Sequence, residues 1–186
     1  EAAKGVTCMQ VAIALGLYCS TKNEGAFKNM WLNFDSSPEL KVLKGSSLSE
    51  AHDSLDFRSW GMSTNIDKAF QLILDVATKN KVKQEDMPDT LIIFSDMQFD
   101  AAGIAGTNFE YMKELYKEAG YAAPNVVFWN LNAEFANSPC LKDDSGAMLV
   151  SGFSPAIMQA VLKGDFESIS PEGLMLSVLQ QDRYNF

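Results

Sequence analysis

A threonine hydroxyl and an aspartate carboxylate are the two side chains whose types and positions favour metal chemistry in this sequence. Asp96 directly follows the apolar run Thr90–Ser95, and Thr64 precedes the amphipathic stretch Asn65–Thr78. Both side chains supply hard oxygen donors, which suit Mg²⁺ or Mn²⁺. The same positions also fit a helix N-cap at Thr64 and a turn residue at Asp96, so spacing alone leaves both interpretations open.

The elements around these residues would have to bring them to one place. Continuous apolar runs predict strands covered on both faces at Thr90–Ser95, Asn125–Leu131 and Ala147–Ser151. An aromatic-rich strand, Met30–Phe34, can pair back with Leu40–Leu43 as a hairpin. Helices are expected over Met9–Ser20 (largely buried), Ser47–Leu55, Asn65–Thr78, Thr107–Ala119 (with Thr107 as N-cap), Ala156–Lys163 and Pro171–Gln181.

This alternation of strands and helices predicts an α/β fold with a doubly wound, mostly parallel sheet that carries helices on both faces. The length of 186 residues, with no linker or repeat, predicts a single domain over residues 1–186. In such a sheet, sites form in the crevice beyond the carboxyl ends of the strands. Thr64 and Asp96 would both lie at that edge.

Composition limits the classes of partner. The formal net charge of −9, with 15 scattered basic residues, argues against direct nucleic-acid binding. No apolar run approaches the ~20 residues of a membrane helix, so no membrane span is expected. Cys8 and Cys19 fall on one predicted helix, roughly 16 Å apart at ~1.5 Å per residue, too far for a disulfide. Reduced thiols indicate a cytoplasmic protein.

Other candidate catalytic residues have simpler explanations. Ser154, between a strand and a helix, resembles a nucleophile elbow, but the second glycine is missing and no histidine follows it. Ser154 is better explained as an N-cap. The single histidine, His52, is expected at the surface, without the neighbours of a zinc site. Gly103–Gly106 lacks the Lys-Ser/Thr pair of a phosphate-binding loop and is interpreted as a turn.

A few polar and aromatic residues remain open to two interpretations. Asp100 can border the metal edge or be a solvated loop carboxylate. Asn130 and Asn132 can line the same edge or simply end their strand. The tryptophans Trp31, Trp60 and Trp129 are assigned to the core and not to base stacking, because most lie on predicted buried strands.

Several segments resemble a von Willebrand factor A domain. Trp60–Ile66 and Ile92–Asp100 are similar to its second and third loops. More narrowly, the chain resembles the C-terminal domain of an uncharacterised intracellular family related to the Ro autoantigen (TROVE) proteins. The further matching segments are Val11–Leu17, Ala119–Tyr121 with Pro124, Phe128–Asn130 and Ser151–Pro155. They follow one another in the expected order through most of the chain.

The resemblance implies a metal-ion-dependent adhesion site with ligands from three loops. Thr64 would be the second-loop ligand and Asp96 the third-loop carboxylate. The first of these loops, an Asp-x-Ser-x-Ser motif after an initial strand, does not occur in Glu1–Thr7. We therefore expect the domain to be N-terminally incomplete here, with its first strand missing and Mg²⁺ or Mn²⁺ binding conditional on upstream residues. A metal-free variant is the second possibility. The missing strand would be central, so its neighbours would lack a backbone partner.

The function expected from the resemblance is that of a non-enzymatic interaction domain. Its carboxyl edge would bind an acidic group of a protein partner through the divalent cation. Two alternatives stay open: a metal-assisted hydrolase that uses Asp96 and Asp100, and a structural module of a ribonucleoprotein whose nucleic acid is held by another domain.

Overall fold

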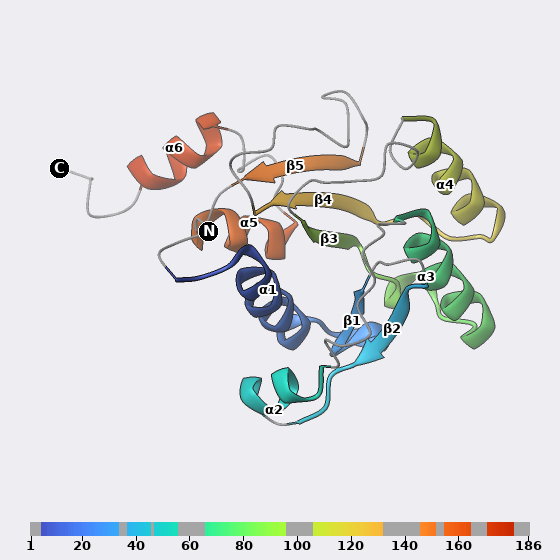
Figure 1. The fold of residues 1–186 in the computed structure, drawn as a ribbon. Coiled ribbons are helices and arrows are strands. Elements are labelled where there is room, and N and C mark those ends of the chain that lie inside the picture. Colours follow the sequence, from blue (N-terminus) through green and yellow to red (C-terminus); the bar gives the residue numbers. More distant parts are fainter. Residues whose placement is uncertain are drawn as a thin grey trace. The chain divides into compact units, whose positions relative to one another are not determined.

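The computed structural model describes residues 5–33, 37–45, 47–55, 66–95, 106–131, 146–151, 155–164 and 171–180 (Figure 1). The chain divides into two compact units, Glu1–Ser151 and Gly152–Phe186. The first unit contains both strands and helices, which confirms the α/β class. None of the helices in these described segments is long and apolar enough to cross a membrane.

A parallel sheet of β3 (Thr90–Ser95), β4 (Asn125–Asn130) and β5 (Ala147–Ser151) forms the centre of the first unit. β4 lies between β3 and β5 and pairs in parallel with both. Val126, Val127, Phe128 and Trp129 of this strand are buried, as expected for a strand covered on both faces. The predicted parallel sheet is therefore confirmed, and β3 and β5 have the bounds expected from their apolar runs.

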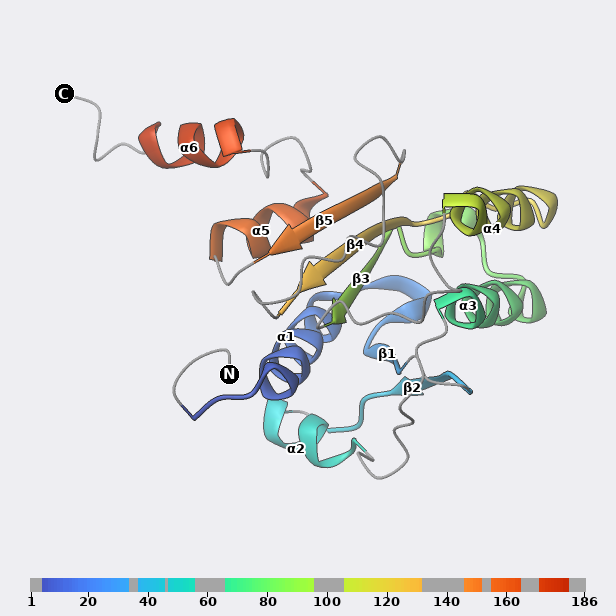
Figure 2. The same cartoon turned by 45° about the horizontal axis from the view of Figure 1, so that its top comes forward.

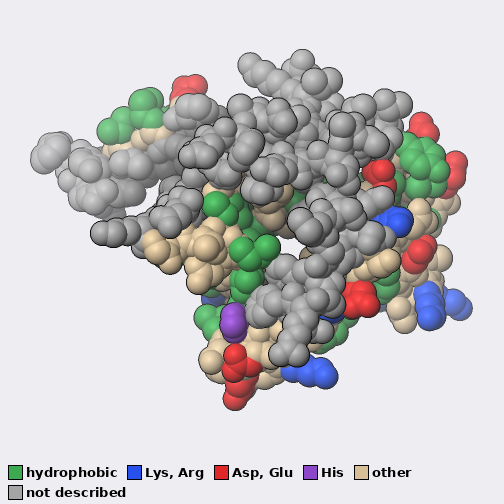
Figure 3. All heavy atoms as spheres, viewed as in Figure 1, with side chains coloured by type: hydrophobic (Ala, Val, Ile, Leu, Met, Phe, Trp, Pro, Cys, Tyr) green, Lys and Arg blue, Asp and Glu red, His purple; other side chains and the backbone are tan. Residues whose placement is uncertain are grey.

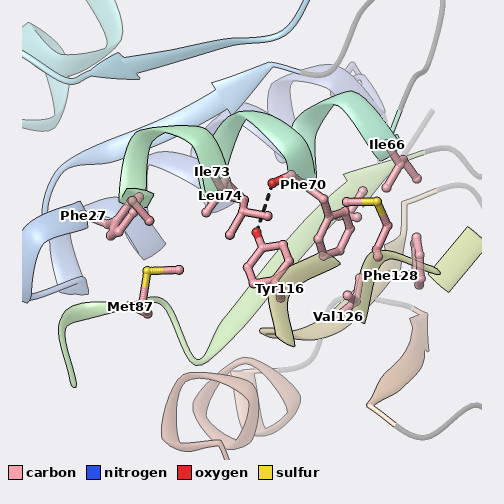
Figure 4. Close-up of a cluster of buried hydrophobic side chains, with 12 residues drawn as sticks. Phe27, Ile66, Phe70, Ile73, Leu74, Met87, Tyr116, Val126 and Phe128 are labelled. Carbon is pink, nitrogen blue, oxygen red and sulfur yellow. Dashed lines mark hydrogen bonds between the residues drawn. The ribbon is translucent and has the colours of Figure 1, made fainter. Parts of the chain in front are cut away.

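Two helices cover one face of this sheet, α3 (Ile66–Asn80) and α4 (Gly106–Glu118). The apolar residues of α3 recur at helical spacing, so one side of the helix is buried. Phe70 of α3 meets Tyr116 of α4 edge to face, and the Tyr116 hydroxyl donates a hydrogen bond to the Phe70 carbonyl at 3.0 Å. Figure 4 shows this contact inside the main core cluster, which also includes Ile93 and Phe128.

A second sheet is the antiparallel hairpin of β1 (Met30–Asn33) and β2 (Glu39–Val42). Short 3-10 turns occur at Gly25–Phe27 and Gln84–Asp86. The hairpin is followed by α2 (Leu48–Asp53), which Ser47 and Glu50 begin with a reciprocal capping box. The predicted hairpin is confirmed. It forms its own sheet within the described residues and does not extend the parallel one.

Helix α1 (Cys8–Lys22) begins with a second capping box, in which Thr7 and Gln10 satisfy each other's backbone N–H groups. The helix contacts β1, β3 and α2. The expectation that it would be largely buried is wrong. Only Leu17 and Ser20 are buried, whereas Met9 and Tyr18 are exposed. Because apolar residues occur on every side of this helix, its sequence does not indicate which side packs against the rest of the unit.

The fourth predicted helix starts earlier than expected. α4 already includes Gly106, so Thr107 is inside the helix and the prediction that it is the N-cap is wrong. In the second unit, α5 (Pro155–Lys163) and α6 (Pro171–Leu179) agree with the predicted helices to within two residues. Gly164, with φ of +68°, follows α5 in the left-handed conformation that ends many helices.

Candidate functional site

The carboxyl ends of the three parallel strands form one edge, and each strand ends in a polar residue there. Ser95 of β3 is paired with Asn130 of β4, which is paired with Ser151 of β5. Residues in register on neighbouring strands lie about 5 Å apart and point to the same face. That face is the one covered by α3, because Ile93 and Phe128, two residues back, belong to the main core cluster.

Sequence reasoning identified only Asn130 of this polar row and missed Ser95 and Ser151. The signal was present, since each apolar run changes to a small polar residue at its last position: TLIIFS, NVVFWN and AMLVS. Asn130 and Ser95 are half-buried and Ser151 is exposed. The row supplies hydroxyl and amide oxygens but no charge.

Two helices begin at the same edge. The Cys8 thiol, in the first turn of α1, donates to the carbonyl oxygen of Leu131, directly after β4, at 3.2 Å. Figure 4 shows Ile66, the first residue of α3, at the end of the core cluster that holds Phe128, with Phe27 and Met87 at the other end. Because the first N–H groups of a helix carry partial positive charge, both helix starts favour negatively charged ligands at this edge.

The two proposed metal ligands, Thr64 and Asp96, lie outside the described residues. Their nearest described neighbours are Ile66, which begins α3, and Ser95, which ends β3. Three further candidates, Asp100, Asn132 and Ser154, also lie outside, as do Trp60 and Gly103 to Ala105. In the part of the chain that is described, no group of three or more His, Cys, Asp and Glu side chains is placed to hold a metal ion.

The remaining sequence-based candidates fall where the sequence predicts. His52 is exposed on α2, with Nδ1 at 3.3 Å from a carboxylate oxygen of Asp53. Figure 3 shows acidic and basic side chains interspersed on the described part of that face. Trp129 is buried against Phe94, and Trp31 packs against the small cluster around Leu17. The core assignment of these two tryptophans is confirmed.

Cys8 and Cys19 of α1 are not joined in a disulfide, as their eleven-residue spacing on one helix predicts. Burial raises the pKa of Cys19 from its ordinary value of 9.0 to about 11. The folded protein therefore holds this proton more tightly than the unfolded chain. The resulting contribution to stability is complete below pH 9 and is lost as the pH rises to about 11.

We expect Cys19 to alkylate slowly in the folded protein. The thiolate is the reacting form, and a pKa two units higher lowers its population on the order of 100-fold near pH 8. Iodoacetamide labelling of a Cys8→Ser, Cys140→Ser variant, in buffer and in urea, measures this difference directly. Equal rates in the two solvents would show that the thiol is not shielded by burial.

Comparison with known proteins assigns the family. Residues 1–183 match the family described as Domain of unknown function (DUF7788). The chain belongs to the DUF7788 family. This DUF7788 chain is also similar to an uncharacterized protein of Acanthamoeba polyphaga mimivirus, with 38% identity over 176 residues. The alignment covers 92% of this chain and 30% of the viral protein, so the chain spans under a third of that relative's length. No solved structure matches the DUF7788 chain.

Proposed function

We propose that this chain is a non-enzymatic protein-interaction domain with a von Willebrand factor A-like, doubly wound fold. It would bind an acidic group of a partner through Mg²⁺ or Mn²⁺ at the carboxyl edge of the sheet. Thr64 and Asp96 would be two of the cation's ligands, and upstream residues would supply the rest. The absence of a disulfide between Cys8 and Cys19 of α1 fits a cytoplasmic location for such a domain.

The convergence of the polar strand ends Ser95, Asn130 and Ser151 at one edge carries this proposal. Asp96 directly follows Ser95, the last residue of β3, and Thr64 precedes Ile66, the first residue of α3, by two residues. Neighbouring hydroxyl and amide oxygens, such as those of Ser95 and Asn130, suit the coordination sphere or the hydrogen-bonding shell of a hard cation. Thr64 and Asp96 alone would make a poor site, so the cation depends on further oxygen ligands.

The test is a calorimetric titration of Mn²⁺ into the natural polypeptide that includes the residues upstream of Glu1. We expect Thr64→Ala and Asp96→Asn each to weaken Mn²⁺ binding by at least about tenfold, because each removes a direct ligand. Asp89→Asn is the matched control, since Asp89 is exposed at the opposite end of β3. Thr78→Ala is the control for the threonine, since Thr78 is exposed in the last turn of α3.

The same variants separate the proposal from a hydrolase. Wild-type protein should bind an acidic peptide only with Mn²⁺ or Mg²⁺ present, and should not turn over generic ester or phosphate substrates. If the upstream residues are present and Mn²⁺ neither binds nor stabilises the protein, the adhesion-site proposal is wrong. Metal-dependent turnover that Asp96→Asn removes would favour the hydrolase instead.

A further inference from the structure

Strand β5 is the last strand on one side of the parallel sheet. Figure 2 shows it beyond β4, and no other strand among the described residues pairs with its second side. Leu149, in the middle of β5, is 42% exposed, and Ser151 at its end is exposed as well. A strand edge of this kind presents backbone donors and acceptors that can pair with a further strand.

The hydrogen bonds to β4 show which backbone groups of β5 point outward. Val126 of β4 donates to the Gly146 carbonyl at 2.8 Å and is in register with Ala147. In a parallel ladder, a residue bonds to the two neighbours of its register partner, so alternate residues of β5 point their groups to opposite sides. The residues whose N–H and C=O groups point away from β4 are Ala147, Leu149 and Ser151.

This edge carries none of the features by which proteins usually prevent strand pairing. Those features are charged side chains, proline and β-bulges. The segment Ala147–Ser151 (AMLVS) contains neither a charge nor a proline, and its register with β4 is continuous. β2 also has no second partner strand in the described part of the chain, but it carries Glu39 and Lys41, whose charged groups lie 3.3 Å apart. Of these two edges, β5 is the one suited to pairing.

The outward groups of β5 are also symmetric about Leu149. In an antiparallel ladder, two opposite residues exchange both of their hydrogen bonds when their groups point toward each other. A second copy, related by a two-fold axis at Leu149, places Leu149 opposite its own counterpart and Ala147 opposite Ser151. Every outward group of the strand then has a partner. The two exposed Leu149 side chains would lie on the same face, with Cβ atoms about 5 Å apart, and would cover each other.

We propose that β5 is a dimerisation edge, at which two copies of this chain pair their β5 strands antiparallel and join their parallel sheets into one. Such a contact uses the same surface on both copies, as a two-fold interface requires. The net charge of −9 on each copy opposes association, although none of these charges is on β5. A five-residue strand is small beside the roughly 1,200 Å² of a stable interface, so the dimer is weak and tightens as salt screens the charges.

Amide hydrogen exchange and sedimentation equilibrium of the full natural polypeptide, at high ionic strength, test this pairing. The probes are the Leu149 and Ser151 amides, which point outward, and the internal control is the Val150 amide, which points to β4. Leu149→Lys would place two ammonium groups opposite each other at the two-fold axis, where like charges are destabilising. Val42→Lys is the matched control, because Val42 is an apolar residue of β2 that is 54% exposed.

We expect the Leu149 and Ser151 amides to exchange at least about tenfold more slowly at high than at low protein concentration, with the Val150 rate unchanged. Leu149→Lys should raise the dissociation constant of the dimer at least about tenfold, because it removes the apolar contact and adds the repulsion. Val42→Lys should leave the dissociation constant as it is. An unchanged Val150 rate in Leu149→Lys shows that this variant is folded.

Three results would overturn the proposal. One is a polypeptide that stays monomeric at every concentration, with Leu149 and Ser151 exchange independent of concentration. Another is equally slow exchange of both amides in monomeric Leu149→Lys, since the edge would then be covered by the chain itself. The third is a dimer that Leu149→Lys leaves intact and Met175→Lys dissociates, since the copies would then associate through α6, where Met175 is 53% exposed.

Discussion

Replacing Phe70 by alanine is expected to lower the free energy of unfolding by about 3 to 5 kcal/mol, the range for deleting a buried aromatic side chain. Phe70 is only 2% exposed. Its ring meets Phe109 and Tyr116 edge to face, at centroid distances of 6.4 and 6.3 Å. Alanine would leave a cavity between α3 and α4 and remove both ring contacts. Urea denaturation followed by circular dichroism measures the change.

Tyr111→Ala is the matched control for Phe70→Ala. Tyr111 is an aromatic residue of α4, but its side chain is 57% exposed. Its replacement should change the free energy of unfolding by about 0.5 kcal/mol or less. If the two variants lose similar stability, the cluster between α3 and α4 does not hold the unit together.

Replacing Phe70 is also expected to affect the candidate site indirectly, through the position of α3. Its contacts fix α3 against the sheet, and α3 begins at the carboxyl edge, two residues after Thr64. A loss of Mn²⁺ binding in Phe70→Ala would therefore reflect a displaced helix and not a lost ligand. The ligand variants are informative only where their free energy of unfolding equals that of wild type.

The sequence predicts the strands of the parallel sheet well because their signal is local. Thr90–Ser95 and Ala147–Ser151 are continuous apolar runs with turn residues around them, and both strands have the expected bounds. The helix around Phe70 is predicted to within two residues at each end, since its apolar residues recur at helical spacing.

The errors arise where structure depends on distant contacts. The burial of α1 depends on which of its sides contacts β1 and β3. The sequence of an all-apolar helix does not indicate which side that is. The polar row of Ser95 and Ser151 needed the strand register, which no single segment specifies.

The second large effect is expected at Gly45, in the turn between β2 and α2. Gly45 has φ of +111°, a conformation that side chains rarely adopt. A Cβ atom added at this position would collide with Glu50 Cβ and would lie 3.1 Å from the Glu50 carbonyl carbon. Glu50 cannot easily withdraw, because its backbone and its carboxylate both belong to the capping box with Ser47. Gly45→Ala should therefore destabilise the protein by about 3 kcal/mol or more.

Gly120→Ala separates the backbone strain of a positive φ from the collision with Glu50. Gly120, after α4, has φ of +85°, but an added Cβ would meet nothing within 4 Å. Its replacement should cost only the backbone strain, about 1 to 2 kcal/mol. The excess loss in Gly45→Ala, measured by urea denaturation, then reports the collision with Glu50. Replacing Glu50 by alanine would leave the Glu50 Cβ atom in place. Adding Gly45→Ala to the Glu50→Ala variant should therefore still lower the free energy of unfolding by more than Gly120→Ala does. Equal losses in the two glycine variants would show that the turn before α2 can shift and that the Ser47 cap does not fix it.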